Sequence, residues 1–202
     1  ADVAASVYGG VLAYQLGPGR DHAQAPLTNT AVSTSQPGHV RALAWPSDLA
    51  IRVFSVGHGV STTALLTDVF AQRTPAIATA LQQLHLTGRD ACAACADGHS
   101  ADLIRALEHG AHAIDRLGHA IGRDLLLPPL RALRAELAPA PGETSGPRWA
   151  IKSTGAGGEL AIAVGWRDAD WADVDARIVR LGMTPVEART DVPGVDIVAA
   201  PL

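Results

Sequence analysis

The sequence is poor in aromatic side chains and has no long hydrophobic run. Aromatic residues make up 4% of the 202 residues, although hydrophobic residues in total reach 48%. Every apolar stretch is interrupted by Arg, Asp, His, Gly or Pro, which excludes a membrane-spanning helix of about 20 apolar residues. The core must therefore consist of small aliphatic side chains packed between helices and sheet, and the length suits one large or two small domains.

The sequence also lacks a large excess of either positive or negative charge. The chain has 16 Lys and Arg against 20 Asp and Glu, a net charge of −4, and no basic block that would neutralise a phosphate backbone. We therefore expect neither nucleic acid nor a membrane as a partner. No signal peptide is visible at the start, so we expect a cytoplasmic protein. Because the sequence begins with Ala rather than Met, we also expect it to be part of a larger protein.

The two cysteines, Cys92 and Cys95, cannot form a disulfide framework. Their spacing invites a zinc or redox interpretation, but His85 and His109 lie outside the usual zinc-finger spacings. A thioredoxin-like motif would follow a strand, whereas residues 91–98 read as a link between helices. We therefore expect two ordinary thiols and no metal site.

Hydrophobic periodicity predicts a mixed α+β fold. Residues 17–47 lack periodicity and are expected to form a loop. From residue 49 onward, the order strand, helices, strand, strand, helix, strand matches the split β-α-β ferredoxin-like pattern with an enlarged first crossover. Strands are expected at 11–16, from 49 to about 57, at 149–153, 160–166 and 195–199. Helices are expected from 61, from 75, at 100–123, at 128–137 and from a cap at Asp168 or Asp170 to Gly182.

The helix expected at 100–123 carries His112, Asp115 and His119 on one face, away from its apolar stripe. These three side chains suggest a ligand set of histidine and aspartate. A solvated face with weak i,i+3 and i,i+4 pairs is the interpretation that we favour.

The strongest local signal is a glycine-rich loop between two predicted strands. Small residues let successive backbone N–H groups point into one concavity, and a lysine and two hydroxyls add donors for a phosphate. The loop lacks the Gly-Lys-Ser/Thr ending of a Walker loop, and the chain has no helix-opening G-x-G-x-x-G motif. A glycine-rich turn without a ligand explains the loop alone equally well. The loop consists of Lys152, Ser153, Thr154, Gly155, Ala156, Gly157 and Gly158.

The segment 1–10, ADVAASVYGG, is a second candidate motif, and it precedes the glycine-rich loop in the chain. Together the two are similar to motifs of the GHMP kinase superfamily, most closely of phosphomevalonate kinases, which carry Gly-Ser-Gly-x-Asp-x-Ala-x-x-x-Tyr-Gly and, further on, Lys-Pro-Ser-Gly-Ala-Gly-Gly-Gly-Asp. The stretch 58–69 resembles that family's Ala-Ser-Thr helix start, and 125–137 resembles its Pro-Glu-Leu helix.

This resemblance implies an α+β fold in which 48–202 form the ferredoxin-like C-terminal domain and 1–47 are a remnant of the N-terminal domain. It implies phosphoryl transfer from ATP, with Mg²⁺, to a phosphorylated isoprenoid-precursor alcohol. Asp2 takes the position of the catalytic carboxylate, and Lys152 to Gly158 take that of the phosphate- and substrate-binding loop. Ser6, Ser61 and Thr62 are further candidates for the substrate pocket.

The sequence departs from the family in three places. Nothing in the 202 residues matches the family's glycine-rich ATP loop, so we expect a separate N-terminal segment to supply it. Glu159 follows Gly158 where the family has Gly-Asp, and Ser153 stands where proline is usual. The alternative is therefore an inactive GHMP-kinase-like remnant that binds a metabolite or a protein, with a second copy of the chain as one such partner. Mevalonate, galactose and homoserine stay open as acceptors.

Overall fold

The fold is described from a computed structural model, which covers residues 11–15, 39–57, 61–139, 142, 146–155 and 159–188. The chain divides into two compact units, one of Trp45–Ala188 and one of Ala1–Ala44 with Arg189–Leu202. The predicted domain boundary between residues 47 and 48 stays a prediction.

The smaller unit contains two described strands, β1 (Val11–Gln15) and β2 (His39–Leu43), which pair antiparallel. The strand expected at 11–16 is thus confirmed. The expectation of loop throughout 17–47 is wrong at 39–43. The alternation there is short and follows Pro37 and Gly38, and the strand is defined by pairing with residues far away in the sequence, which leaves no local signal.

The larger unit is built on a four-stranded antiparallel sheet in the order β4-β5-β3-β6. This is the order of a split β-α-β ferredoxin-like sheet, so the predicted fold class is confirmed. The fourth strand comes earlier than the one expected at 195–199, which lies outside the described residues. The strands are β3 (Leu49–Ser55), β4 (Trp149–Ser153), β5 (Leu160–Trp166) and β6 (Thr184–Val186).

Local signals start the helices where the sequence predicts them. Ser61, Thr74 and Asp170 each accept a hydrogen bond from a backbone N–H in the first turn of the following helix. The helices are α2 (Thr62–Gln72), α3 (Pro75–Asp97), α4 (Ser100–Ile121), α5 (Pro128–Glu136) and α6 (Trp171–Arg180).

The link expected at 91–98 is wrong, because α3 continues to Asp97 and contains both cysteines. The alanine-rich sequence of this segment favours a helix. The helix ends at Gly98, whose φ of 70° is the left-handed conformation that glycine adopts readily.

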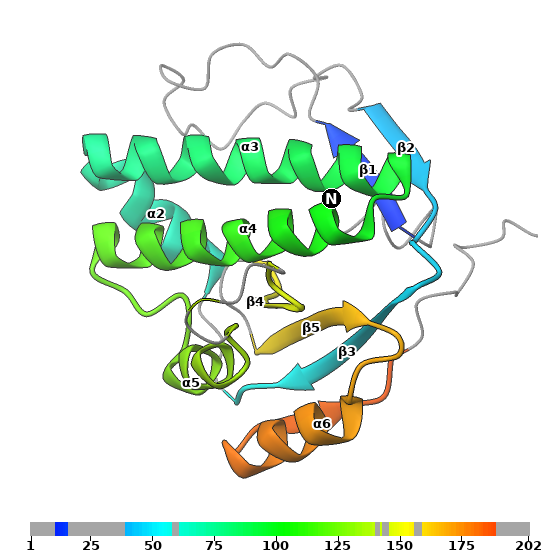
Figure 1. The fold of residues 1–202 in the computed structure, drawn as a ribbon. Coiled ribbons are helices and arrows are strands. Elements are labelled where there is room, and N and C mark those ends of the chain that lie inside the picture. Colours follow the sequence, from blue (N-terminus) through cyan, green and yellow to red (C-terminus); the bar gives the residue numbers. More distant parts are fainter. Residues whose placement is uncertain are drawn as a thin grey trace, which may run out of the picture. The chain divides into compact units, whose positions relative to one another are not determined.

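The sheet lies between two layers of helices. One face contributes Phe54, Ile151, Ala161 and Ala163 to a core shared with buried side chains of α5 and α6. Figure 1 shows α4 on the other side of the sheet from α6. There α2, α3 and α4 share a second core, which includes Leu65, Val69, Ile77, Ala80, Ile114, Leu117 and Ile121.

None of the helices in the described part of the chain is both long and apolar enough to cross a membrane.

Candidate functional site

The glycine-rich loop connects two paired strands at one edge of the sheet. Ser153 pairs with Ala161 at the end of the β4–β5 ladder. Beyond it, the backbone N and the Oγ1 of Thr154 both donate to the carbonyl of Leu160 at 2.9 Å. Gly155 has a φ of 57°, which makes glycine the natural residue for this turn. Ala156, Gly157 and Gly158 lie outside the described residues.

The end of β3 adjoins this turn. Because β3 and β4 each run antiparallel to β5, their carboxyl ends lie at the same edge of the sheet. The backbone N of Val56 donates to the carbonyl of Glu159 at 2.8 Å, which joins the two segments directly. Ser61, the N-cap of α2, follows four residues after Gly57. The sheet thus brings the end of β3 and the start of the glycine-rich turn to one edge, although they are more than 90 residues apart in the sequence.

Lys152 is the only lysine among the 202 residues. Its side chain is partly buried, and its Nζ donates to the carbonyl of Ser153 at 2.8 Å. Burial lowers the pKa of the Lys152 ammonium. In the described part of the chain no carboxylate lies within ion-pair distance of this ammonium. A desolvated cation without a counter-ion, at the start of a glycine-rich turn, is a feature typical of an anion-binding site.

The two hydroxyl residues of the loop, unlike Lys152, are not placed to donate a hydrogen bond to a ligand. Ser153 points to the opposite face of the sheet, in the row of Phe54 and Ala161, and is 1% exposed. Its Oγ has no hydrogen-bond partner among the described residues. The hydroxyl of Thr154 is already bonded to Leu160. The donor left for a ligand in residues 152–155 is therefore the Lys152 ammonium, together with the backbone of the turn.

The other sequence-predicted site residues divide into two groups. The Oγ of Ser61 accepts from the backbone N of Ala64 at 3.4 Å, so it serves as a helix cap, and Thr62 is exposed beside it. Asp2 and Ser6 lie outside the described residues. The site roles of all four stay predictions.

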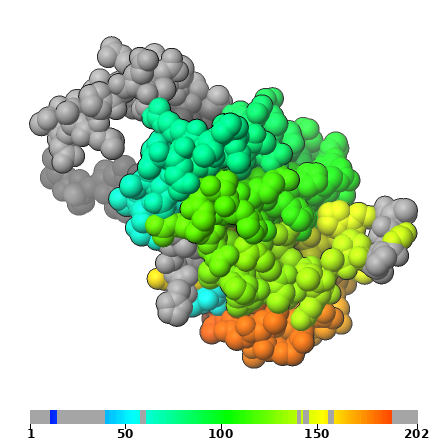
Figure 2. Space-filling view, turned by 90° about the vertical axis from the view of Figure 1, so that its left-hand side faces the viewer, coloured from blue at the N-terminus to red at the C-terminus, as the bar shows by residue number. Residues whose placement is uncertain are grey.

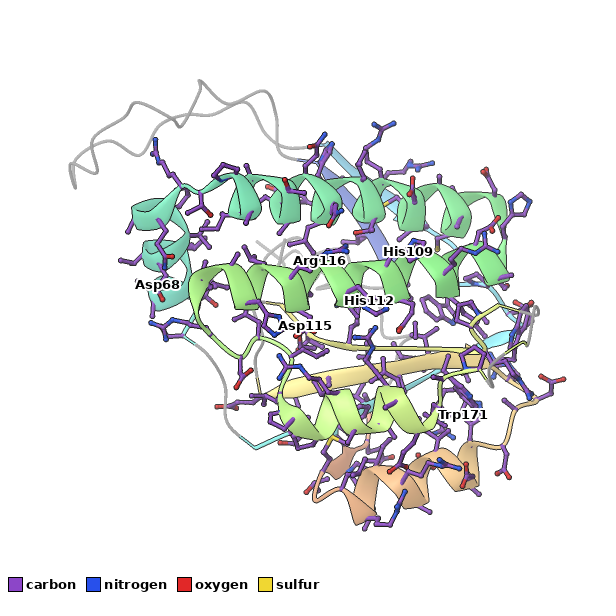
Figure 3. The ribbon with its side chains drawn as sticks, turned by 60° about the vertical axis from the view of Figure 1, so that its left-hand side comes forward. Asp68, His109, His112, Asp115, Arg116 and Trp171 are labelled. Carbon is purple, nitrogen blue, oxygen red and sulfur yellow. The ribbon has the colours of Figure 1, made fainter. Side chains whose placement is uncertain are left out.

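The polar face of α4 has a neighbour that the sequence did not reveal. Asp115 accepts hydrogen bonds from Arg131 of α5, at 3.1 Å from Nε and 2.6 Å from Nη2. His112 and His119 are exposed, and Figure 3 shows His112 and Asp115 on the side of α4 toward α5. Across the described ranges, no group of three or more His, Cys, Asp or Glu could hold a metal ion. Arg131 could have been found only from the packing of α5 against α4.

Comparison with known proteins gives a likeness of fold. No protein-family model and no curated protein matches the chain. Among solved structures, the Lin0012 protein of Listeria innocua matches with a TM-score of 0.61 and 18% identity, over 75% of this chain and 42% of that one. The phosphomevalonate kinase of Streptococcus pneumoniae matches with a TM-score of 0.58 and 18% identity, over 74% and 42%.

The mevalonate kinase of L. major, in complex with R-mevalonate, matches with a TM-score of 0.57 and 19% identity, over 89% of this chain and 46% of that one. The chain therefore spans less than half the length of these three proteins. Its mixed α+β fold resembles part of the GHMP kinase fold, at low sequence identity.

Proposed function

We propose that this chain is part of an ATP-dependent small-molecule kinase of the GHMP type, in which the sheet edge at Lys152 holds the phosphate of a phosphorylated isoprenoid-precursor alcohol. The observation that carries this proposal is the desolvated ammonium of the only lysine, which lies beside a glycine-rich turn and has no carboxylate within ion-pair distance among the described residues. The pneumococcal phosphomevalonate kinase, which shares the fold, has been solved with phosphomevalonate and AMPPNP.

Lys152 is suited to bind a phosphate rather than a neutral alcohol. A buried charge is unfavourable unless it is paired. A phosphate dianion beside the ammonium would supply the missing counter-ion, and backbone N–H groups of the turn would add hydrogen bonds in a site partly shielded from water. A hydroxyl of an unphosphorylated alcohol would accept a hydrogen bond but leave the charge unbalanced.

We propose roles for the remaining predicted residues on the basis of the sequence resemblance. Asp2 would accept the proton of the attacking hydroxyl, which makes the oxygen a better nucleophile. Ser6, Ser61 and Thr62 would contact the acceptor alcohol, and the turn from Ser153 to Gly158 would stabilise negative charge in the transition state. A cytoplasmic location is part of the same proposal.

Neither a nucleotide-binding motif in the sequence nor a group of metal ligands in the described residues supplies a site for ATP or Mg²⁺. The 202 residues contain no glycine loop that opens a helix in the pattern that holds a nucleotide. In the part of the chain that the structure describes, no cluster of metal-ligating side chains occurs. We therefore assign this chain the acceptor side of the reaction and propose that an N-terminal segment or a separate chain holds the nucleotide.

The single lysine allows a direct binding test. Growth with lysine labelled with ¹³C at Cε gives one lysine signal in the NMR spectrum, whose position reports the protonation state of Lys152. We expect phosphomevalonate to shift this signal and to raise the Lys152 pKa, because an anion stabilises the ammonium. Mevalonate, which lacks the phosphate, serves as the control ligand. An unchanged lysine signal at saturating phosphomevalonate, or an equal response to both ligands, would overturn the assignment.

Turnover is tested separately from binding. The chain is co-expressed with a candidate nucleotide-binding segment, and ADP release is measured with phosphomevalonate. We expect turnover that Asp2→Asn reduces by about 100-fold or more, with ligand binding unchanged. Binding without turnover for any candidate segment would favour the second function, an inactive metabolite-binding module. Glu159, in place of the family's Gly-Asp, is the observation behind that alternative.

A further inference from the structure

An open groove of about 600 Å³ lies between α4 and α5, beside β4, the outermost described strand at one side of the sheet. Figure 2 faces this side of the molecule, with α4 and α5 one above the other. Among the described residues, those of the glycine-rich turn do not line the groove. The groove is therefore separate from the proposed kinase site.

The register of the sheet fixes which backbone groups of β4 point toward the groove. The backbone N of Thr154 donates to the carbonyl of Leu160, and this pair continues the β4–β5 ladder. In an antiparallel ladder, residues that bond to the partner strand alternate with residues that do not. The even-numbered residues of β4 therefore bond to β5. The N–H and C=O groups of Trp149, Ile151 and Ser153 point to the other side of β4, where the groove lies.

Ile151 has two buried backbone groups without a protein partner. The residue is 1% exposed, and nothing in the described ranges bonds to its outward N–H or C=O. At Ser153 the situation differs, because its carbonyl accepts from the Lys152 ammonium at 2.8 Å. More than about 90% of buried backbone groups are paired in native proteins. The two groups of Ile151 therefore favour a bound molecule that supplies one donor and one acceptor.

The floor of the groove is apolar and includes a firmly held aromatic ring. Leu137 and Pro139, from the segment after α5, line it together with Trp149. The Trp149 ring packs on Gly165 so closely that a Cβ would not fit there. It also meets Trp171 edge to face, with ring centroids 4.8 Å apart. A rigid aromatic surface contacts an apolar ligand with little loss of conformational entropy.

The carboxylates and guanidinium groups of the groove walls already have partners. They belong to Arg105, Glu108, Asp115, Arg131 and Arg134. Arg105 pairs with Asp102 at 2.7 Å, and Arg131 pairs with both Asp115 and Asp124. The remaining two, one on α4 and one on α5, pair with each other. A charged ligand would lose its hydration without gaining a counter-ion, which favours an uncharged one.

We propose that this groove binds a small uncharged molecule, with an apolar body on Trp149 and a carboxamide group on the backbone of Ile151. The carboxamide N–H would donate to the Ile151 carbonyl, and the carboxamide oxygen would accept from the Ile151 N–H. The deep burial of Ile151 favours such a small group over a whole peptide strand. The groove volume lies within the range of about 300–1,000 Å³ that is common for small-molecule sites, which are mostly apolar with a few placed polar groups.

Three aromatic probes of similar shape test the proposal: 2-naphthamide, 2-naphthoate and N,N-dimethyl-2-naphthamide. Each is titrated into the ¹⁵N-labelled full chain at neutral pH, and the backbone N–H signal of Ile151 is followed by NMR. We expect 2-naphthamide to shift this signal downfield and to bind about tenfold or more tightly than the charged 2-naphthoate. The dimethyl amide, which has lost its donor, should bind about threefold to tenfold more weakly than 2-naphthamide.

Three outcomes would overturn the proposal. Equal affinities for 2-naphthamide and 2-naphthoate would show a merely apolar surface. Absence of a shift of the Ile151 signal, up to the solubility limit of 2-naphthamide, would show that no carboxamide reaches the strand. A shift caused by the uncharged peptide acetyl-Val-Thr-Val-amide, but not by 2-naphthamide, would assign this side of β4 to a peptide strand instead.

A pair of matched variants locates the binding. Ala135 lines the groove on α5 and is exposed, so Ala135→Trp fills the groove without disturbing the core. Ala176 is exposed on α6, away from the groove, and Ala176→Trp is the control. We expect Ala135→Trp to weaken 2-naphthamide binding by about tenfold or more and Ala176→Trp to leave it unchanged. Equal affinities of the two variants would place the ligand elsewhere and overturn the proposal.

Discussion

At the scale of single residues, the two buried serines of the described chain differ in whether the hydroxyl has a partner. Ser100 is 5% exposed and donates to Asp48 at 2.5 Å, whereas Ser153 is 1% exposed and its hydroxyl has no partner among the residues that the structure describes. An unpaired buried hydroxyl is unfavourable, and its removal relieves that cost. The same chemical change should therefore have opposite effects at the two positions.

We expect Ser153→Ala to leave the free energy of unfolding unchanged or to raise it by up to about 1 kcal/mol. Ser100→Ala should lower it by about 0.5–1.5 kcal/mol, because the hydrogen bond from the buried hydroxyl to the exposed Asp48 carboxylate is lost. Urea unfolding measures both. Destabilisation by Ser153→Ala as large as that by Ser100→Ala would show that Ser153 has a partner in solution.

Lys152 should reduce stability in a pH-dependent way. Burial lowers its pKa in the folded protein, so the unfolded chain holds more protons between the folded pKa and the ordinary value of about 10.5. The free energy of unfolding should therefore rise as the pH increases through that window. Below it, the cost of the desolvated ammonium is fully present.

Lys152→Met should remove this alkaline rise and raise the free energy of unfolding at pH 7 by about 1 kcal/mol or more. Arg148→Met, an exposed change four residues earlier, is the control and should stay within about 0.5 kcal/mol of the parent. The comparison is made by urea unfolding at pH 7 and pH 10. Parallel curves for the parent and Lys152→Met would show that the ammonium is well solvated.

At the scale of elements, two helical glycines occupy opposite environments. A Cβ at Gly118 of α4 would lie 2.6 Å from the backbone O of Arg123, where the chain turns after the helix. A Cβ at Gly88 of α3 would have nothing within 4 Å. Gly118 is thus required by the close approach of the loop to α4, while Gly88 only weakens its helix.

We expect Gly118→Ala to lower the free energy of unfolding by about 1–3 kcal/mol, because the backbone of the loop must shift. Gly88→Ala should raise it by about 0.5–1 kcal/mol through helix propensity. Thermal unfolding of the two variants and the parent measures both changes in stability. A stable Gly118→Ala variant would mean that the loop after α4 moves easily.

The elements also show how far sequence reasoning reached. The cap Ser61, the choice of Asp168 or Asp170 as a second cap, and the apolar stripe of α4 were recognisable, because each signal is local. The structure places the second cap at Asp170. The same reasoning placed a link at 91–98, where helix propensity continues α3, and missed β2, whose definition depends on pairing across the chain. The ion pair between Arg134 and Glu108 was missed because the two side chains meet only through the packing of α5 against α4.

For the candidate site, the sequence indicated the glycine-rich loop but not how its side chains divide. Strand alternation places Lys152 and Ser153 on opposite faces. The hydrogen bond of Thr154 to Leu160 depends on the β4–β5 register, which composition does not reveal. The distinction between Lys152, which we propose binds the ligand, and Ser153, which lies in the core, therefore needed the structure.

At the scale of the whole molecule, the larger unit should open from its edges. Strand β5 is paired on both sides, whereas β6 has three exposed residues and, among the described strands, pairs with β3 alone. We expect the amides of β5 to be the slowest to exchange with deuterated solvent and those of β6 to exchange much faster. Hydrogen exchange followed by NMR measures this. Equal protection of β5 and β6 would show that the sheet opens as one unit.

The single lysine also makes the chain a substrate for one cut by a lysine-specific endoproteinase. Proteases bind their substrates as extended segments, so scission after Lys152 needs β4 to separate from β5 first. The rate of that scission, measured from the appearance of two fragments on a gel, would then report how often the edge of the sheet opens.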